Sequence, residues 1–305
     1  MRGLAIFWQV SVFAISNYLF EIAYYKYLGG GTVVKYIDTT TEKALKKSVM
    51  DLLNLTSDEL DNIFDSIFND AEKEPWKWVE DFLADYIVDE TLEYIQMFHL
   101  TRRLNGTDLK ANDNLEQLLL EESPISSFFK KHNVTFKSGN KHIDLYYKGK
   151  LQPFENEYEY RNGNIYYVRS RLGYNTSQDY CVNGFAFRWH LEEEQNGYYH
   201  LLSQGPELIQ NLEELLGIHG MTFDYYENSK YYCIEYLIPI SEVIFDMSFP
   251  PENDHDKMTE LLKLSILRLY DGWRRSSFVC DENLILRLAD NATVKPEWFI
   301  NAEEL

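Results

Sequence analysis

The chain has 305 residues, and its 49 acidic and 29 basic side chains give a formal net charge of −20. With 45% apolar and 15% aromatic residues, the composition is that of a globular protein and excludes a disordered one. The charge argues against nonspecific binding to nucleic acid or anionic lipid, because both need clustered Lys and Arg. An acidic chain can use its charge for solubility or to complement a basic protein surface.

The N-terminal segment is apolar. Residues 4–15 form a mostly apolar run that is too short for a membrane span, and apolar positions recur as far as Tyr25. This spacing predicts an amphipathic helix that packs on its own domain or on a partner. A cleaved secretion signal is the alternative, since the run has the length of a signal-peptide core.

Two amphipathic helices are predicted between residues 56 and 87. Thr56 and Glu59 have the spacing of a capping box at the start of the first, and Pro75 suits the first turn of the second. A third helix, capped by Asp113 and Glu116, is expected to end at Ser123-Pro124. Apolar residues recur at helical spacing in the first two, at Leu60, Ile63, Phe64, Ile67 and Phe68 and at Val79, Phe82, Leu83, Tyr86 and Ile87.

The most acidic part of the chain lies between Asp51 and Glu93. It has 14 Asp or Glu against Lys73 and Lys77. One interpretation is a solvated helical face. The other is a negative surface for a basic partner, which the self-repulsion of so many like charges favours. The candidate partner-binding residues are acidic side chains of the two predicted helices, Asp58, Glu59, Asp61, Asp65, Asp81 and Asp85.

From about residue 136 the apolar period changes to two, which is typical of strands. Asn162-Gly163 predicts a tight turn between strands 155–161 and 164–171, and Asn196-Gly197 predicts a second hairpin that joins 184–191 to 198–203.

Three aromatic side chains, Phe185, Phe187 and Trp189, share one face of the second predicted hairpin. A face of this kind usually packs into the chain's own core. The alternative is a self-association contact that makes the chain a homo-oligomer, because aromatic residues dominate interface hot spots.

Two further helices are predicted in the C-terminal half. Gly205-Pro206 opens one that Gly217 closes, and residues 257–269 form another that Asp271-Gly272 is expected to break. The aromatic residues around Trp298 are expected to dock the C-terminal tail.

Strands complete this half. Residues 221–226 are expected to pair with 231–238, and residues 284–288 to form a short strand. The predicted fold class is α+β, with an acidic, mainly helical region 1–135 followed by an aromatic-rich antiparallel domain 136–305.

The sequence patterns typical of metal and phosphate sites are absent. The seven histidines form no HExxH or HxH pair, and the three cysteines, Cys181, Cys233 and Cys280, are too widely spaced for a zinc site. Gly29-Gly30-Gly31 lacks the Lys that a phosphate loop needs. We therefore predict no metal, no cofactor and reduced, mostly buried thiols.

One enzymatic arrangement remains as an alternative. An Arg on a strand (Arg169 or Arg171), then Ser276, then Glu282 follow the Arg–Ser–Glu order of ADP-ribosyltransferases, which this part of the chain loosely resembles. The resemblance implies an Arg that holds the phosphates of NAD and a Glu that stabilises an oxocarbenium-like state. The Ser-Thr-Ser strand signature of that family is absent, and Ser276 lies too close to Glu282.

The acidic helical half, the aromatic C-terminal half and the lack of a recognisable catalytic motif together resemble phage-encoded inhibitors of bacterial defence, among them the anti-Gabija inhibitors. The resemblance extends over the whole chain and has no diagnostic motif. It implies an oligomeric assembly around a defence nuclease that blocks access to DNA. In that assembly Phe185 and Phe187 would make self-contacts, and region 51–93 would face the nuclease.

These patterns predict a non-enzymatic, cytoplasmic protein that occludes a basic partner, by electrostatic steering followed by burial of aromatic anchors. The expected partner is a nucleic-acid-processing nuclease complex, in the host cytoplasm if the chain is phage-encoded. Direct binding to nucleic acid or to a membrane is not expected. The alternatives are the NAD-using transferase, a secreted protein, and a protein with an unrelated small ligand.

Overall fold

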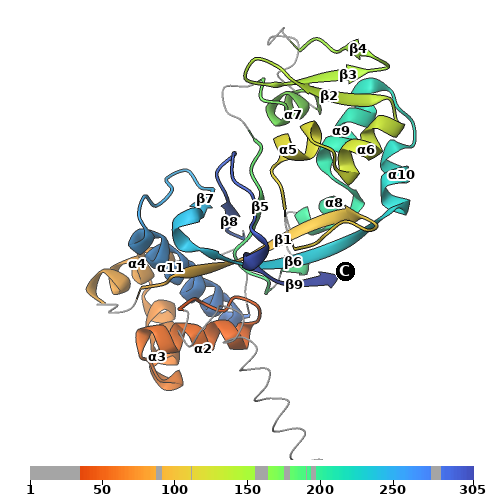
Figure 1. The fold of residues 1–305 in the computed structure, drawn as a ribbon. Coiled ribbons are helices and arrows are strands. Elements are labelled where there is room, and N and C mark those ends of the chain that lie inside the picture. The colour runs from red at the N-terminus through yellow and green to blue at the C-terminus, as the bar shows by residue number, and fades with distance from the viewer. Residues whose placement is uncertain are drawn as a thin grey trace, which may run out of the picture. The chain divides into compact units, whose positions relative to one another are not determined.

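The computed structural model describes residues 35–86, 91–110, 112–154, 164–174, 179–189, 191–193, 197–275 and 283–305. Residues 37–305 form one compact unit, and of the other unit, residues 1–36, only Lys35 and Tyr36 are described. The predicted N-terminal helix and the Gly29–Gly31 run therefore lie outside the described residues. The fold class is α+β, as predicted (Figure 1).

A six-stranded antiparallel sheet has the order β7-β8-β5-β1-β6-β9. Its longest pair joins β1 (Tyr94–Leu104) to β6 (Ser229–Pro239) along the full length of both strands. The other strands are β5 (Asn183–Phe185), β7 (Ile244–Phe245), β8 (Ile285–Arg287) and β9 (Phe299–Glu304). The sequence patterns predict no strand at β1. Because β1 pairs with β6, the predicted boundary at residue 135 does not separate two compact units.

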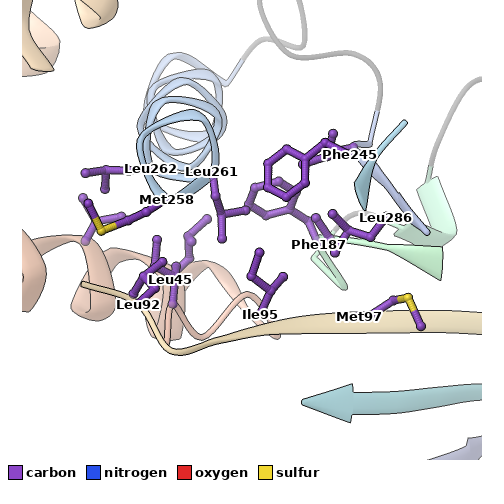
Figure 2. Close-up of a cluster of buried hydrophobic side chains, with 14 of the residues drawn as sticks. Leu45, Leu92, Ile95, Met97, Phe187, Phe245, Met258, Leu261, Leu262 and Leu286 are labelled. Carbon is purple, nitrogen blue, oxygen red and sulfur yellow. The ribbon is translucent and has the colours of Figure 1, made fainter. Parts of the chain in front are cut away.

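The largest core lies between one face of this sheet and four helices, α2 (Glu42–Leu53), α3 (Ser57–Asn69), α4 (Pro75–Asp85) and α11 (Asp254–Arg274). Figure 2 shows Leu45 of α2, Leu261 of α11 and Ile95 of β1 among the side chains that fill it. Side chains alternate along a strand, so Ile95 faces this core while Phe98 and Leu100 join a small cluster on the other face.

The predicted starts of α3 and α4 are confirmed. The Glu59 N–H donates to Thr56 Oγ1 at 3.3 Å, and the Thr56 N–H donates back to Glu59 Oε2 at 2.7 Å. Pro75 is the first residue of α4. Phe68, predicted on the buried stripe of α3, is instead 58% exposed.

The predicted break at Asp271-Gly272 is wrong, since α11 continues to Arg274. A Cβ at Gly272 would lie 2.7 Å from the ring of Trp189. The glycine therefore makes room for a ring that packs against the helix, and it does not end the helix.

A second core joins a three-stranded sheet, β2 (Val134–Ser138), β3 (Ile143–Tyr147) and β4 (Lys150–Leu151), to short helices. These are α5 (Leu115–Leu120), α6 (Pro124–Lys131), α7 (Asn164–Arg171), α9 (Glu207–Leu216) and α10 (Met221–Glu227). The predicted helix with Gly217 as its C-cap is confirmed as α9. The cap of α5 is Asn114, one residue after the predicted Asp113. Ser123-Pro124 also begins α6, where Ser123 and Ser126 form a capping box.

Single-turn helices and α8 connect the rest. They are α8 (Tyr198–Gln204), η1 (Leu191–Glu193), η2 (Ile240–Glu242) and η3 (Pro296–Trp298). Trp298 is buried in the large core, so the expected docking of the C-terminal tail is confirmed.

The three predicted strand pairs of residues 155–238 are wrong, although 231–238 is a strand within β6 and residues 184 and 185 lie in β5. Residues 164–171 form α7, 198–203 lie in α8, and 221–226 lie in α10. The turns at Asn162-Gly163 and Asn196-Gly197 include residues outside the described ones. Short aromatic-rich segments fit either period, and here packing decides: α7 lies against α9, and Val168 is fully buried in the second core.

Gly184 fixes how closely β5 approaches β1. A Cβ at Gly184 would lie 2.7 Å from Met97 Cγ and 2.8 Å from the carbonyl oxygen of Phe98, which is backbone and cannot easily shift. Gly184→Ala is expected to lower the free energy of unfolding by about 1–3 kcal/mol. Asn183→Ala, at the exposed neighbour, is expected to change it by less than about 0.5 kcal/mol. Urea unfolding measures both, and equal stabilities would contradict this close approach.

Candidate functional site

Three of the six predicted acidic residues are free for a partner. Asp58 and Asp65 are exposed two turns apart on one face of α3, and Asp85 is exposed in the last turn of α4. None of the three forms an ion pair within the described part of the chain. A carboxylate in the last turn of a helix opposes the helix dipole, so Asp85 does not contribute to the stability of α4.

The other three serve the chain's own structure. Glu59 completes the capping box of α3. Asp61 pairs with Lys46 at 3.1 Å, and Asp81 pairs with both Lys73 and Lys77 at 3.0 Å. The lysines of this region thus form ion pairs within it. The exposed Glu72 and Glu74 add to the negative charge that these pairs do not neutralise.

Exposed aromatic rings accompany the free carboxylates. Phe68, 58% exposed, follows Asp65 by one helical turn, and the 38% exposed ring of Trp273 meets it edge-on at 6.2 Å between ring centres. Trp76 in the first turn of α4 is 51% exposed. Arg274 stacks over Phe68 at 5.6 Å. We call the exposed surface of α3, α4 and the end of α11 that carries these side chains the acidic–aromatic face; its residues are Asp58, Asp65, Phe68, Trp76, Asp85 and Trp273.

The aromatic residues predicted for self-association lie elsewhere. Phe187 is fully buried and Phe185 is 6% exposed, each in a core of this chain. Trp189 is half-buried against the large core. The chain itself therefore supplies the burial that a second copy would provide. Phe187 and Trp189 pack in the large core, and Phe185 packs in the small cluster with Phe98 and Leu100. Self-association as such stays a prediction.

The two arginines of the enzymatic alternative do not lie on the expected strand. Arg169 and Arg171 lie on the helix α7 and not on a strand. Arg169 is buried, and Arg171 forms an ion pair with Glu207. Ser276 and Glu282 lie outside the described residues. The predicted strand 164–171, which the alternative requires, is therefore wrong, and the roles of Ser276 and Glu282 stay predictions.

Cys181 and Cys233 are free cysteines, and burial raises the pKa of the Cys233 thiol to about 12. Over the ranges that the structure describes, no three His, Cys, Asp or Glu side chains group closely enough to hold a metal ion. Within the same ranges, no helix combines the length and apolarity of a membrane span.

A cavity of about 500 Å³ lies beside the C-terminal part of β1. β5 pairs with β1 through Phe98 opposite Phe185, and among the described strands none pairs with residues 101–104 on that side. The cavity opens there. Residues 99–104 of β1 line one side of it, and α5, α6 and α9 supply an apolar wall that includes Leu115, Leu118, Leu119, Ile125, Phe129, Leu208 and Ile209.

Two adjacent arginines of β1 line this cavity, and Arg102 is held firmly. Its Nε donates to Ser229 Oγ at 3.0 Å, and its Nη1 donates to the Ser203 carbonyl at 2.9 Å. Its Nη2 donates to the carbonyls of Tyr226 and Ser229 at 3.0 and 2.8 Å. Arg102 therefore joins the ends of α8 and α10 to the start of β6.

Arg103 has none of these contacts. Its Nε is buried without a hydrogen-bond partner, and the guanidinium forms no ion pair within the described ranges. Burial lowers the pKa of Arg103, and the charges of Tyr236, Tyr225 and Asp113 partly oppose that shift. Arg side chains nonetheless stay protonated in proteins. Among the described residues, the cavity thus contains a cation that has no ion pair, and the Asp113 carboxylate acts on it only through its charge.

His99 stands on the same face of β1 as Arg103. Its Nδ1 lies 2.6 Å from the Asn183 carbonyl and must donate to it, which leaves Nε2 as an acceptor with no partner among the described residues. Burial, followed by the charge of Arg103, lowers the pKa of His99 to about 3. The imidazole is therefore neutral at physiological pH, and it offers a lone pair toward the cavity.

A second cavity, of about 450 Å³, lies around Arg188. Its cation is already paired, with Glu192 and, at 3.4 Å, with Glu303. Of these two cavities, the one beside β1 therefore contains the arginine without an ion pair among the described residues.

Comparison of the chain with protein-family models, curated proteins and solved structures finds no match. The acidic–aromatic face and the Arg103 cavity are therefore argued from their own geometry.

Sequence reasoning missed His99 and Arg103 because it missed β1. The available signal was an Arg102-Arg103 pair that follows an apolar run soon after the acidic region 51–93.

Folding keeps His99 neutral, so acid should destabilise the protein through this residue. The pKa of His99 in the folded protein, about 3, lies below its ordinary value of 6.5. The contribution of His99 to the free energy of unfolding is therefore complete above pH 6.5, and it falls as the pH drops toward 3. The loss reaches up to about 1.4 kcal/mol per pH unit in that window.

His99→Asn keeps a donor near the Asn183 carbonyl and does not titrate. Its unfolding free energy, measured with urea, is expected to fall less steeply between about pH 6.5 and about pH 4.5 than that of the parent. Both proteins share all their carboxylates, so identical slopes would rule out a neutral buried His99.

Proposed function

We propose that the chain binds a basic protein surface through the acidic–aromatic face. The observation that carries this proposal is the exposure of large rings, Phe68 and Trp76, on the same two helices as carboxylates without intrachain partners. Exposed aromatic side chains of this size are unusual on a surface that serves solubility alone.

The two kinds of residue have different tasks in such an interface. Free carboxylates such as Asp58 and Asp65 attract a basic partner over a distance and accelerate encounter. The rings then supply the buried contact area, because Trp and other aromatics contribute most to interface hot spots. Asp61 and Asp81 take no part, since their lysine partners already neutralise them.

The partner class that fits is a protein with an exposed cationic groove, as nucleic-acid-processing enzymes have. An acidic protein seated in such a groove occludes it, because it competes with the phosphates that the groove is built to bind. Inhibition by occlusion, which the resemblance to anti-defence inhibitors implies, is included in this proposal.

Charge reversal at Asp58, Asp65 and Asp85 to Lys tests the proposal. The partner is first captured from host extract at low salt and then purified. Reversal is expected to lower its association rate about tenfold or more, with an effect that shrinks as salt is added. Surface plasmon resonance measures the rate across a salt series.

The matched control reverses three exposed carboxylates elsewhere, Glu122, Glu227 and Glu252, and changes the net charge equally. It is expected to affect the rate only weakly. If both triple variants slow association to the same extent, net charge and not this face governs binding, and the proposal fails. Phe68→Ser with Trp76→Ser is expected to raise the dissociation rate instead, since rings act after encounter.

A further inference from the structure

We propose that the Arg103 cavity binds a small organic anion whose negative group pairs with the Arg103 guanidinium and whose apolar body packs on α5, α6 and α9. This site is separate from the acidic–aromatic face, and either proposal can fail without the other.

Leaving the Arg103 guanidinium without a partner has a free-energy cost. A buried guanidinium without an anion or a full set of acceptors is destabilising, and proteins rarely keep one without a use. Its neighbour Arg102 shows the usual solution, with four donated hydrogen bonds. Arg103 has no such set, and its Nε lacks any partner. A bound anion would supply the ion pair that the chain itself does not provide for Arg103.

The size and the lining of the cavity suit a small organic ligand. A cavity of about 500 Å³ falls within the range of metabolite-binding sites. Its wall on α5, α6 and α9 is aliphatic and aromatic, as an apolar ligand body requires. The neutral His99 offers an acceptor beside the cation, suited to a hydroxyl or amide N–H on the ligand.

Charged side chains other than Arg103 also line the cavity. Arg171 is already paired with Glu207. The Asp179 and Asp246 carboxylates act on the Cys181 thiol, where burial raises the pKa to about 11 and their charges add to that shift. Asp113 also lines the cavity, but it is exposed and acts on Arg103 through its charge without an ion pair. Among the described lining residues, Arg103 is therefore the cation with neither an ion pair nor a set of acceptors, and it can recognise an anion.

Two fluorescent probes that differ in one group test the proposal. Anilinonaphthalene sulfonate is an apolar body with one negative group, and N-phenyl-naphthylamine is the same body without it. The parent is expected to bind the sulfonate at a saturable site and more tightly than the neutral probe. Arg103→Met is expected to weaken sulfonate binding about tenfold or more and to leave the neutral probe within about twofold.

Three variants serve as controls. Leu118→Trp fills the cavity and should weaken both probes. Lys150→Met removes an exposed cation elsewhere and should weaken neither. Arg103→Lys keeps the charge without the planar fork, so it should recover part of the sulfonate affinity.

Thermal unfolding separates a ligand-binding Arg103 from a structural one. Arg103→Met should leave the melting temperature unchanged or raised, because it removes an unpaired charge whose Nε is buried. Arg102→Met should lower it, because it removes four hydrogen bonds. The proposal is overturned if the parent has no saturable sulfonate site, or if Arg103→Met binds the sulfonate as the parent does. It is also overturned if Arg103→Met loses both probes together with thermal stability.

Discussion

The pairing of β1 with β6 is the interaction on which the rest of the structure depends. Its register carries Tyr94 opposite Pro239 through to Leu104 opposite Ser229. Because side chains alternate, the two strands contribute Ile95 and Ile234 to the large core and Phe98 and Cys233 to the small one. The same ladder then extends to Arg102 and Arg103, past the end of β5. A single long pair thus sets both cores and the polar side of the cavity.

Local signals predicted the helices whose ends are chemically marked. The capping box at Thr56, Pro75 and the glycine cap at Gly217 each satisfy backbone groups within a few residues, so the sequence alone indicates them. The segment that became α7 has no such mark. Its tyrosines and valine favour a strand by propensity, and it is helical because Val168 is buried in the core that it shares with α9. The sequence patterns do not predict β1 for a related reason: its partner strand, β6, lies far along the chain.

The two candidate sites differ in how much of each can be predicted from the sequence. The excess of acid between Asp51 and Glu93 is visible by counting, but the pairing that removes Asp61 and Asp81 from the free charge depends on where Lys46, Lys73 and Lys77 fold. Arg102 and Arg103 are identical in type and adjacent, and the pleat alone gives one a full set of acceptors and the other none. Only the folded ladder distinguishes them.

The strand β9 determines how the sheet meets its surroundings. It holds the outer position next to β6, where Lys230 pairs with Glu304 at 2.8 Å and Arg188 with Glu303 at 3.4 Å. Without it, the backbone of β6 from Tyr232 to Tyr236 would present unpaired donors and acceptors, a template for another chain. The acidic residues of β9 repel a like edge. The last strand therefore protects the protein against aggregation through its longest ladder, and a truncated form would be expected to lose solubility before it loses its fold.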